Sequence, residues 1–167
     1  YVELNKKVIE VTGSDRLTWL NDMFSQKLDQ LDSGQSTEAL WLDVNGRILR
    51  DFHVVAETDS VFLITFSEGV EELLSQLQRL VFRAQVKLNL REELKVFATF
   101  NAGVESAIAI WQDSWPETTS GGWRYGPVST EPWAYFENLM VDAPSELTPA
   151  SIQALTALRV AAWRPTG

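Results

Sequence analysis

The chain has 167 residues, 45% of them hydrophobic, and its 23 acidic and 14 basic residues give a formal net charge of −9. Such a chain repels polyanions at long range, which argues against general nucleic-acid binding. It has no Cys and no run of about 18 apolar residues, which excludes a disulfide frame, a thiolate metal site and a transmembrane helix. Its N-terminus lacks the layout of a signal peptide, so we expect a cytoplasmic protein with no membrane partner.

The first half of the sequence predicts strands joined mainly by hairpins, with helices set between them. The clearest turn is at Asn45-Gly46, because this dipeptide between two apolar runs favours a type I′ turn with positive φ at both positions. In chain order, the expected elements are a strand over 8–11, a short helix over 17–24, strands over 38–44, 48–55 and 61–66, an amphipathic helix over 70–82 and a strand over 83–90.

The second half begins after a cluster of three charges at 91–93, which separates two apolar runs. We therefore predict two subdomains, 1–91 and 92–167. Pro149 is expected to open the last helix, since a missing N–H costs little in the first turn. The expected elements are strands over 95–100, 108–111, 123–125 and 133–141, a surface loop over 114–122 and a final helix over 149–163. Together the halves predict an α+β fold with antiparallel sheets and flanking helices.

The strand after the Asn-Gly turn holds the best candidate site residues. Alternation places Arg50, Phe52 and Val54 on one face, and Asp51 and His53 on the other. Charged groups in the middle of a sheet must be paired or face a polar cavity. A cavity with an Arg and an aromatic side chain suits a flat heterocycle with an acidic tail; the alternative is an Arg–Asp pair on an exposed sheet face.

Other patterns give no catalytic residue and no metal ligand. His53 is the single His of the chain, which argues against a Ser–His–Asp catalytic triad. A His on a strand is more typical of a structural role. The Gly121-Gly122 pair lacks the following Lys-Ser/Thr of a phosphate loop. The paired acids at 71–72 and 92–93 are typical of solvated faces.

Several segments share their order and spacing with known motifs. Residues 42–51, Leu-Asp-Val-Asn-Gly-Arg-Ile-Leu-Arg-Asp, combine a Gly-Arg turn with a closing Asp. They resemble the hairpin of the glycine-cleavage T-protein (aminomethyltransferase) superfamily. This resemblance implies domains arranged in a ring around a central tetrahydrofolate pocket that the hairpin strand helps to line. The other segments that resemble the superfamily are 8–20, 31–35, 80–88 and 155–167.

One departure from the superfamily pattern selects a branch. Aminomethyltransferases carry two adjacent acids after the hairpin, where this chain has Arg50 and Asp51. Arg stays protonated and offers no basic lone pair, so it cannot replace a carboxylate. The YgfZ-like branch also lacks the acid pair. Its Lys-Gly-Cys-Tyr-x-Gly-Gln-Glu segment is absent here, so we expect the N-terminal portion of such a protein, without its C-terminal part.

This resemblance implies a tetrahydrofolate-binding protein that assists iron–sulfur cluster assembly or repair, with iron–sulfur proteins as partners. It implies that Phe52 and Val54 line the folate pocket and that Arg50 offers charge to the pterin or the glutamate tail. Asp51 and Arg159 are carried over from matching positions. Two alternatives stay open: a folate-dependent aminomethyltransferase, and a non-catalytic interaction domain that has kept the fold.

Overall fold

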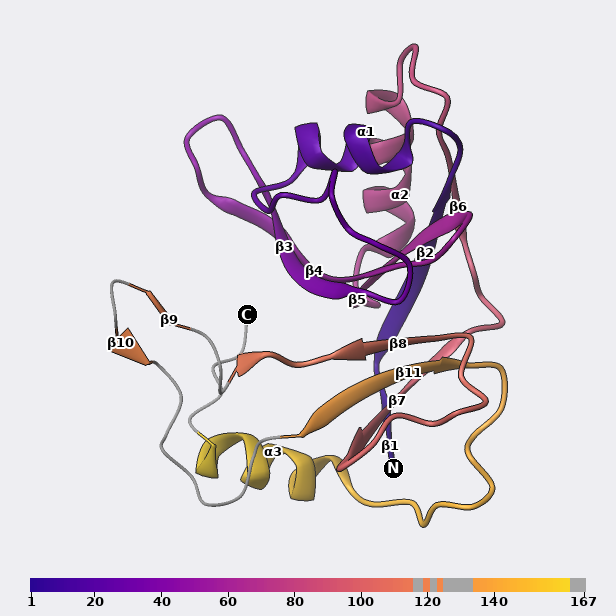
Figure 1. The fold of residues 1–167 in the computed structure, drawn as a ribbon, viewed down its shortest axis with the longest axis vertical. Helices are drawn as coiled ribbons and strands as arrows, with labels where there is room; N and C mark the ends of the chain where they lie inside the picture. The colour runs from indigo at the N-terminus through magenta and orange to yellow at the C-terminus, as the bar shows by residue number, and fades with distance from the viewer. Residues whose placement is uncertain (116–118, 121–122, 125–133, 163–167) are drawn as a thin grey trace.

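The computed structural model describes residues 1–115, 119–120, 123–124 and 134–162. Within these residues two antiparallel sheets lie one above the other, with α1 and α2 on the outer side of one sheet and α3 beside the other (Figure 1). The predicted α+β fold with antiparallel sheets and flanking helices is confirmed. No helix in the described part of the chain is long and apolar enough to cross a membrane.

The first sheet contains five strands in the order β3-β4-β5-β2-β6. The predicted meander forms its first three strands, so β4 has neighbours on both sides. Its strands are β2 (Lys6–Thr12), β3 (Ser36–Leu42), β4 (Ile48–Ala56), β5 (Ser60–Phe66) and β6 (Lys87–Leu90), and its helices are α1 (Arg16–Met23) and α2 (Val70–Leu80).

Both faces of the first sheet are buried, and alternation decides which core each side chain enters. One face packs under α1 and α2, and the other packs against the second sheet. The residues that β2, β4 and β5 send under the helices are Ile9, Val11, Phe52, Val54, Val61 and Leu63. Those that they send toward the second sheet include Val8, Val55, Phe62 and Ile64.

The second sheet contains four strands in the order β1-β7-β11-β8. These strands are β1 (Val2–Leu4), β7 (Lys95–Phe100), β8 (Ala109–Gln112) and β11 (Tyr135–Met140), and α3 (Ile152–Ala161) packs against β1. A separate ribbon pairs β9 (Thr119–Ser120) with β10 (Trp123–Arg124). The chain passes from the first sheet to the second between Leu90 and Lys95, beside the predicted boundary. However, β1 belongs to the second sheet although it opens the chain, and the division into 1–91 and 92–167 stays a prediction.

The turn between β3 and β4 differs from the predicted type I′ turn. Gly46 has φ +78°, whereas Asn45 is not among the residues with positive φ. Gly46 N–H donates to the Asp43 carbonyl, and the Asp43 carboxylate accepts the N–H groups of Asn45 and Arg47. The Asp43 side chain therefore holds a longer loop that closes between Asp43 and Arg47, with a single left-handed residue.

The bounds of several elements also differ from prediction. β6 begins at Lys87, because residues before it are held in a turn: the N–H of Gln85 donates to the carboxylate of Asp15. α3 begins at Ile152, since the Ser151 hydroxyl, rather than Pro149, caps it by accepting the N–H of Ala154. Part of the predicted loop 114–122 is strand β9, and residues 116–118, 121–122, 125–133 and 163–167 lie outside the described residues.

Candidate functional site

Strand β4 positions four of the five predicted site residues, and two of them point into the core. Phe52 is 1% exposed and Val54 is fully buried. The Phe52 ring stacks on Phe24, with 4.8 Å between centroids. The predicted alternation along β4 is therefore confirmed, with Phe52 and Val54 packed under the helices.

Arg50 and Asp51 are half-buried at the start of β4. The Arg50 guanidinium donates from Nη2 to the backbone carbonyl of Glu68, at 2.8 Å, just before α2. The Asp51 carbonyl accepts the Thr65 hydroxyl at 3.0 Å. In the described part of the chain, Arg50 forms no ion pair with a carboxylate, so its positive charge is not neutralised by an acid.

Arg159 lies apart from the other four, in the last turn of α3. It is half-buried. Its positive charge acts against the effects of burial and of Glu137, which raise the pKa of Tyr135 on β11. The structure thus groups Arg50, Asp51, Phe52 and Val54 on one strand of the first sheet and places Arg159 with the second sheet.

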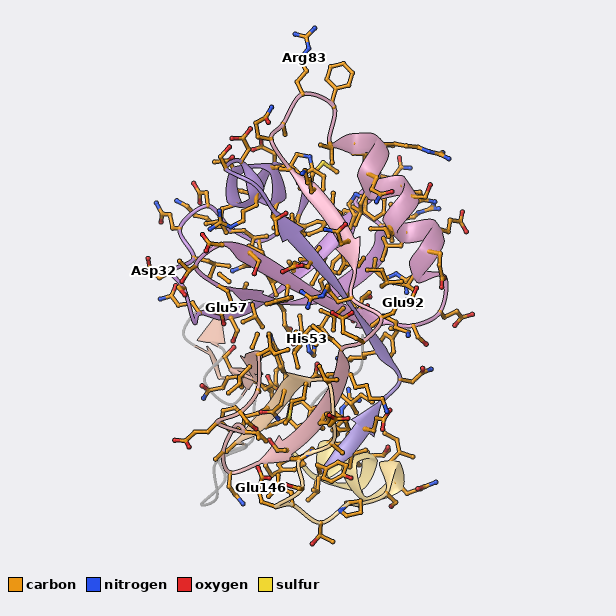
Figure 2. The ribbon with its side chains drawn as sticks, turned by 90° about the vertical axis from the view of Figure 1, so that its right-hand side faces the viewer. Asp32, His53, Glu57, Arg83, Glu92 and Glu146 are labelled. Atoms are coloured by element: carbon orange, nitrogen blue, oxygen red, sulfur yellow. The ribbon has the colours of Figure 1, made fainter. Side chains whose placement is uncertain are left out.

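A charged cluster between the two sheets was not predicted. It consists of Lys6 on β2, His53 on β4 and Glu137 on β11, and we call it the seam cluster. Lys6 Nζ lies 2.7 Å and 3.0 Å from the two Glu137 oxygens, and His53 Nδ1 lies 2.9 Å from Glu137 Oε2. The side chains of Lys6, His53 and Glu137 are 11%, 15% and 1% exposed, so the charges are largely removed from water. Figure 2 shows His53 at the level where the two halves meet.

Aromatic side chains of the second sheet enclose this cluster. The Trp111 indole stacks on the His53 ring, with 3.7 Å between centroids and 13° between planes. Trp111 Nε1 also donates to the Thr37 carbonyl of β3, at 2.9 Å. The Tyr135 hydroxyl donates to Glu137 Oε1 at 3.0 Å. Each of these contacts ties the second sheet to the first or holds the buried carboxylate.

The electrostatics of the cluster favour a charged Glu137. Burial alone raises the pKa of a carboxyl group, but His53 and Lys6 outweigh it and hold the Glu137 pKa well below its ordinary value. Burial and the Glu137 charge raise the pKa of Tyr135 well above its ordinary range, so Tyr135 stays a hydrogen-bond donor. Glu137 thus accepts from Lys6 and Tyr135, and also from His53 when Nδ1 carries a hydrogen, as a buried carboxylate requires.

The His53 ring has one nitrogen with two competing neighbours. Nδ1 lies 2.9 Å from Glu137 Oε2 and 3.2 Å from Lys6 Nζ. An Nδ1–H can donate to the carboxylate, whereas a bare Nδ1 can only accept from the ammonium. Nε2 faces Glu38 Oε1 at 3.8 Å, where Glu38 is 48% exposed. The His53 ring therefore lies between a buried and an exposed carboxylate. No group of three or more His, Cys, Asp or Glu side chains in the described residues could hold a metal ion.

Comparisons with known proteins identify the class of fold. No protein-family model matches the sequence, and no curated protein matches it either. The fold of a little more than half of this chain resembles part of a glycine-cleavage T-protein.

One structure that the chain resembles is the crystal structure of glycine cleavage system aminomethyltransferase T from Bartonella henselae. The TM-score is 0.54 and the sequence identity is 18%. The match covers 58% of this chain and 27% of that protein, so the chain matches little more than a quarter of its length. At this identity the likeness shows the fold alone.

Proposed function

We propose that the protein binds tetrahydrofolate at the start of β4 and, like the YgfZ branch that its sequence resembles, assists iron–sulfur cluster assembly or repair. The observation that carries the proposal is the T-protein-like fold, in which the β3–β4 hairpin bears the motif that resembles the folate-lining hairpin. Iron–sulfur proteins are its proposed partners. The proposal concerns this chain as part of a pocket that several domains build.

Arg50 is the proposed ligand contact for charge. Its guanidinium is half-exposed and is held by a backbone carbonyl rather than by an acid. A cation that is positioned but not neutralised suits a carboxylate tail or an electron-rich pterin oxygen, because guanidinium binds such groups with paired N–H donors. Asp51 beside it and Arg159 from α3 are the further proposed contacts.

The two apolar residues of the predicted set have a different part in this proposal. Phe52 and Val54 are packed under the helices, where a ligand would reach them only if the core opened. We therefore assign them the role of fixing β4 from within the core, so that Arg50 keeps its direction.

A second candidate function is folate-dependent aminomethyl transfer. The fold likeness to an aminomethyltransferase favours it. Arg50 opposes it, because an arginine cannot act as the base that a carboxylate provides at this place. Turnover with glycine-cleavage partners would establish this activity. The interaction-domain alternative predicts a folded chain with no folate affinity.

Calorimetric titration of tetrahydrofolate into the chain tests the proposal. We expect binding that Arg50→Ala weakens roughly tenfold, as loss of one charged hydrogen-bonding group does. Arg79→Ala, which removes an exposed Arg from the last turn of α2, is the matched control and should bind as the wild type does. If the folded protein gives no heat of binding when tetrahydrofolate is added, the folate proposal is overturned.

The iron–sulfur part needs a measurement in cells. The chain, or the same chain with Arg50→Ala, is supplied to cells that lack the protein, and the activity of iron–sulfur enzymes is measured. Restoration by the wild type and not by the variant is expected. Equal restoration by both would separate the cellular role from the proposed folate contact.

A further inference from the structure

The seam cluster joins parts of the chain that are far apart in sequence. Lys6 and Glu137 are separated by 131 residues and His53 and Glu137 by 84, yet their side chains meet between the sheets. The first sheet supplies both nitrogen-bearing side chains, and β11 of the second sheet supplies the carboxylate. The polar contacts of the cluster therefore run across the boundary between the two sheets.

The surface around the cluster is mainly apolar, and its apolar contacts do little to fix how one sheet is placed on the other. Val8, Val55 and Ile64 of the first sheet face Val96 and Leu139 of the second. Apolar burial depends mainly on the area removed from water and tolerates small displacements. Apolar contacts of this kind hold two sheets together without selecting one placement. Outside the cluster, Trp111 and Gln112 at the β8 edge donate hydrogen bonds to β3, to the Thr37 carbonyl and the Ser36 hydroxyl.

The seam cluster does select a placement. β11 alternates Tyr135, Glu137 and Leu139 on the face toward the first sheet. A shift by one repeat of this face, about 7 Å along the strand, would set Tyr135 or Leu139 opposite Lys6. The Lys6 ammonium and the Glu137 carboxylate would then be buried without each other, which is far costlier than the displaced apolar contacts.

Hydrogen bonds link α3 to the second sheet. The N–H of Asp113 donates to the Tyr135 carbonyl, and the Trp115 indole donates to the Ala162 carbonyl at the end of α3. The Tyr135 hydroxyl is in turn bonded to Glu137. α3 thus follows β11, and β11 is tied to β4 through His53.

We propose that the seam cluster is a positioning device: Glu137, held by Lys6 and His53, fixes the placement of the two sheets and so the distance between Arg50 on β4 and Arg159 on α3. The part that concerns ligand affinity rests on the proposed function. Buried ion pairs add little net stability over well-packed apolar side chains, so an apolar replacement can keep the fold while losing the placement. Lys6, His53 and Glu137 are positioning residues in this proposal and none touches the ligand.

The absence of Cys makes the placement measurable. Spin labels attached at Glu71→Cys on α2 and Gln153→Cys on α3, both exposed positions, report the distance between the two halves by pulsed electron resonance. The test variant is Lys6→Met with His53→Phe and Glu137→Leu, which keeps an aromatic ring against Trp111. We expect a folded protein whose distance distribution is shifted or at least twice as broad as that of the wild type.

The matched control removes another ion pair of the same strand. Arg91 pairs with Glu10 of β2 at 2.9 Å, and this pair lies within the first half rather than across the seam. Glu10→Leu with Arg91→Met should leave the distance distribution unchanged. If the triple variant does not fold, Glu137→Gln takes its place, because the amide keeps the shape of the side chain without its charge. A folded seam variant with the wild-type distance distribution would overturn the proposal.

Tetrahydrofolate affinity provides the second readout. We expect the triple variant to bind tetrahydrofolate at least tenfold more weakly although Arg50 is intact. The single variant His53→Asn, in which Lys6 and Glu137 are intact and Asn can still donate to Glu137, should keep most of the affinity. Wild-type affinity in a variant with an altered distance distribution would contradict the link between placement and binding. If the wild type binds no tetrahydrofolate, the proposed function fails, and the distance measurement alone decides the positioning inference.

Discussion

The two faces of strand β4 are both buried, but they bury different kinds of side chain. On the helix side, Phe52 and Val54 enter an apolar core and need no partners with a particular direction. On the seam side, Val55 is also apolar and buried, but His53 enters the space between the two sheets and is held by Glu137 and Trp111. Apolar packing there would also have closed the space. The difference indicates that the helix side provides stability and the seam side provides a defined geometry.

The largest effect is expected on the helix side. Phe52→Ala removes a ring that is 1% exposed and stacks on Phe24, so unfolding free energy should fall by about 4 kcal/mol. Urea denaturation followed by circular dichroism measures it. The loss should be nearly the same across the pH range, since no charge is involved. A loss below about 1 kcal/mol would contradict tight packing at this position.

Glu137→Gln should have a smaller effect that depends on pH. The variant leaves Lys6 without its buried partner, so we expect a loss of about 3 kcal/mol near neutral pH. Because the folded-state pKa of Glu137 lies below its ordinary value of 4.5, the stabilisation from its charge is fully present above that value. It is lost as the pH falls below 4.5 toward the lowered pKa.

The difference in stability between wild type and Glu137→Gln should therefore narrow in acid. Denaturation curves for both proteins at several pH values on either side of the ordinary carboxyl pKa measure this. Phe52→Ala is the control, because its deficit should stay constant over the same series. A Glu137→Gln deficit that is equally large at all pH values would mean that the carboxylate charge adds nothing at the seam.

His53→Phe should cost less than loss of the carboxylate. A Phe ring keeps an aromatic contact with Trp111 but removes one donor from Glu137, which retains Lys6 and Tyr135. We expect a loss of about 1.5 kcal/mol, in the range of one hydrogen bond to a charged group. Thermal unfolding gives the value. An increase in stability would show that His53 was costly to bury and was held there by the rest of the cluster.

Arg50→Ala is expected to have the smallest effect on stability. Its guanidinium holds one backbone carbonyl at a half-exposed position, so the loss should stay within about 0.5 kcal/mol. Chemical denaturation of the variant and the wild type in parallel measures this. A stable variant makes any loss of folate binding attributable to the ligand contact. A loss of about 2 kcal/mol or more would instead make Arg50 part of the structure that holds β4 to α2.

The sequence was sufficient where local patterns decide structure. Alternation along β4 placed Phe52 and Val54 together, and the spacing of Leu73 and Leu77 predicted α2. The turn type was wrong because the Asp43 side chain, which binds two backbone N–H groups, overrode the preference of Asn-Gly.

The seam cluster could not be predicted in the same way. One signal was present: Glu137 stands at an inward position of a strand that otherwise buries Tyr135 and Leu139. Its partner Lys6 is 131 residues away, and local patterns carry no information on such a distant pair. The folate contacts of Arg50, Asp51 and Arg159 remain predictions. The predicted lining of a pocket by Phe52 and Val54 is also untested, although both side chains are packed in the core.

The first two strands also shape how the chain assembles during synthesis. β1 and β2 are separated by Asn5 alone, yet β2 joins the first sheet and β1 pairs with β7, almost a hundred residues later. A nascent chain can complete its first sheet while Val2–Leu4 is still unpaired. Such an unpaired segment exposes backbone donors and acceptors to neighbouring chains. Val2–Leu4 therefore gains its observed partner only after β7, Lys95–Phe100, has been synthesised.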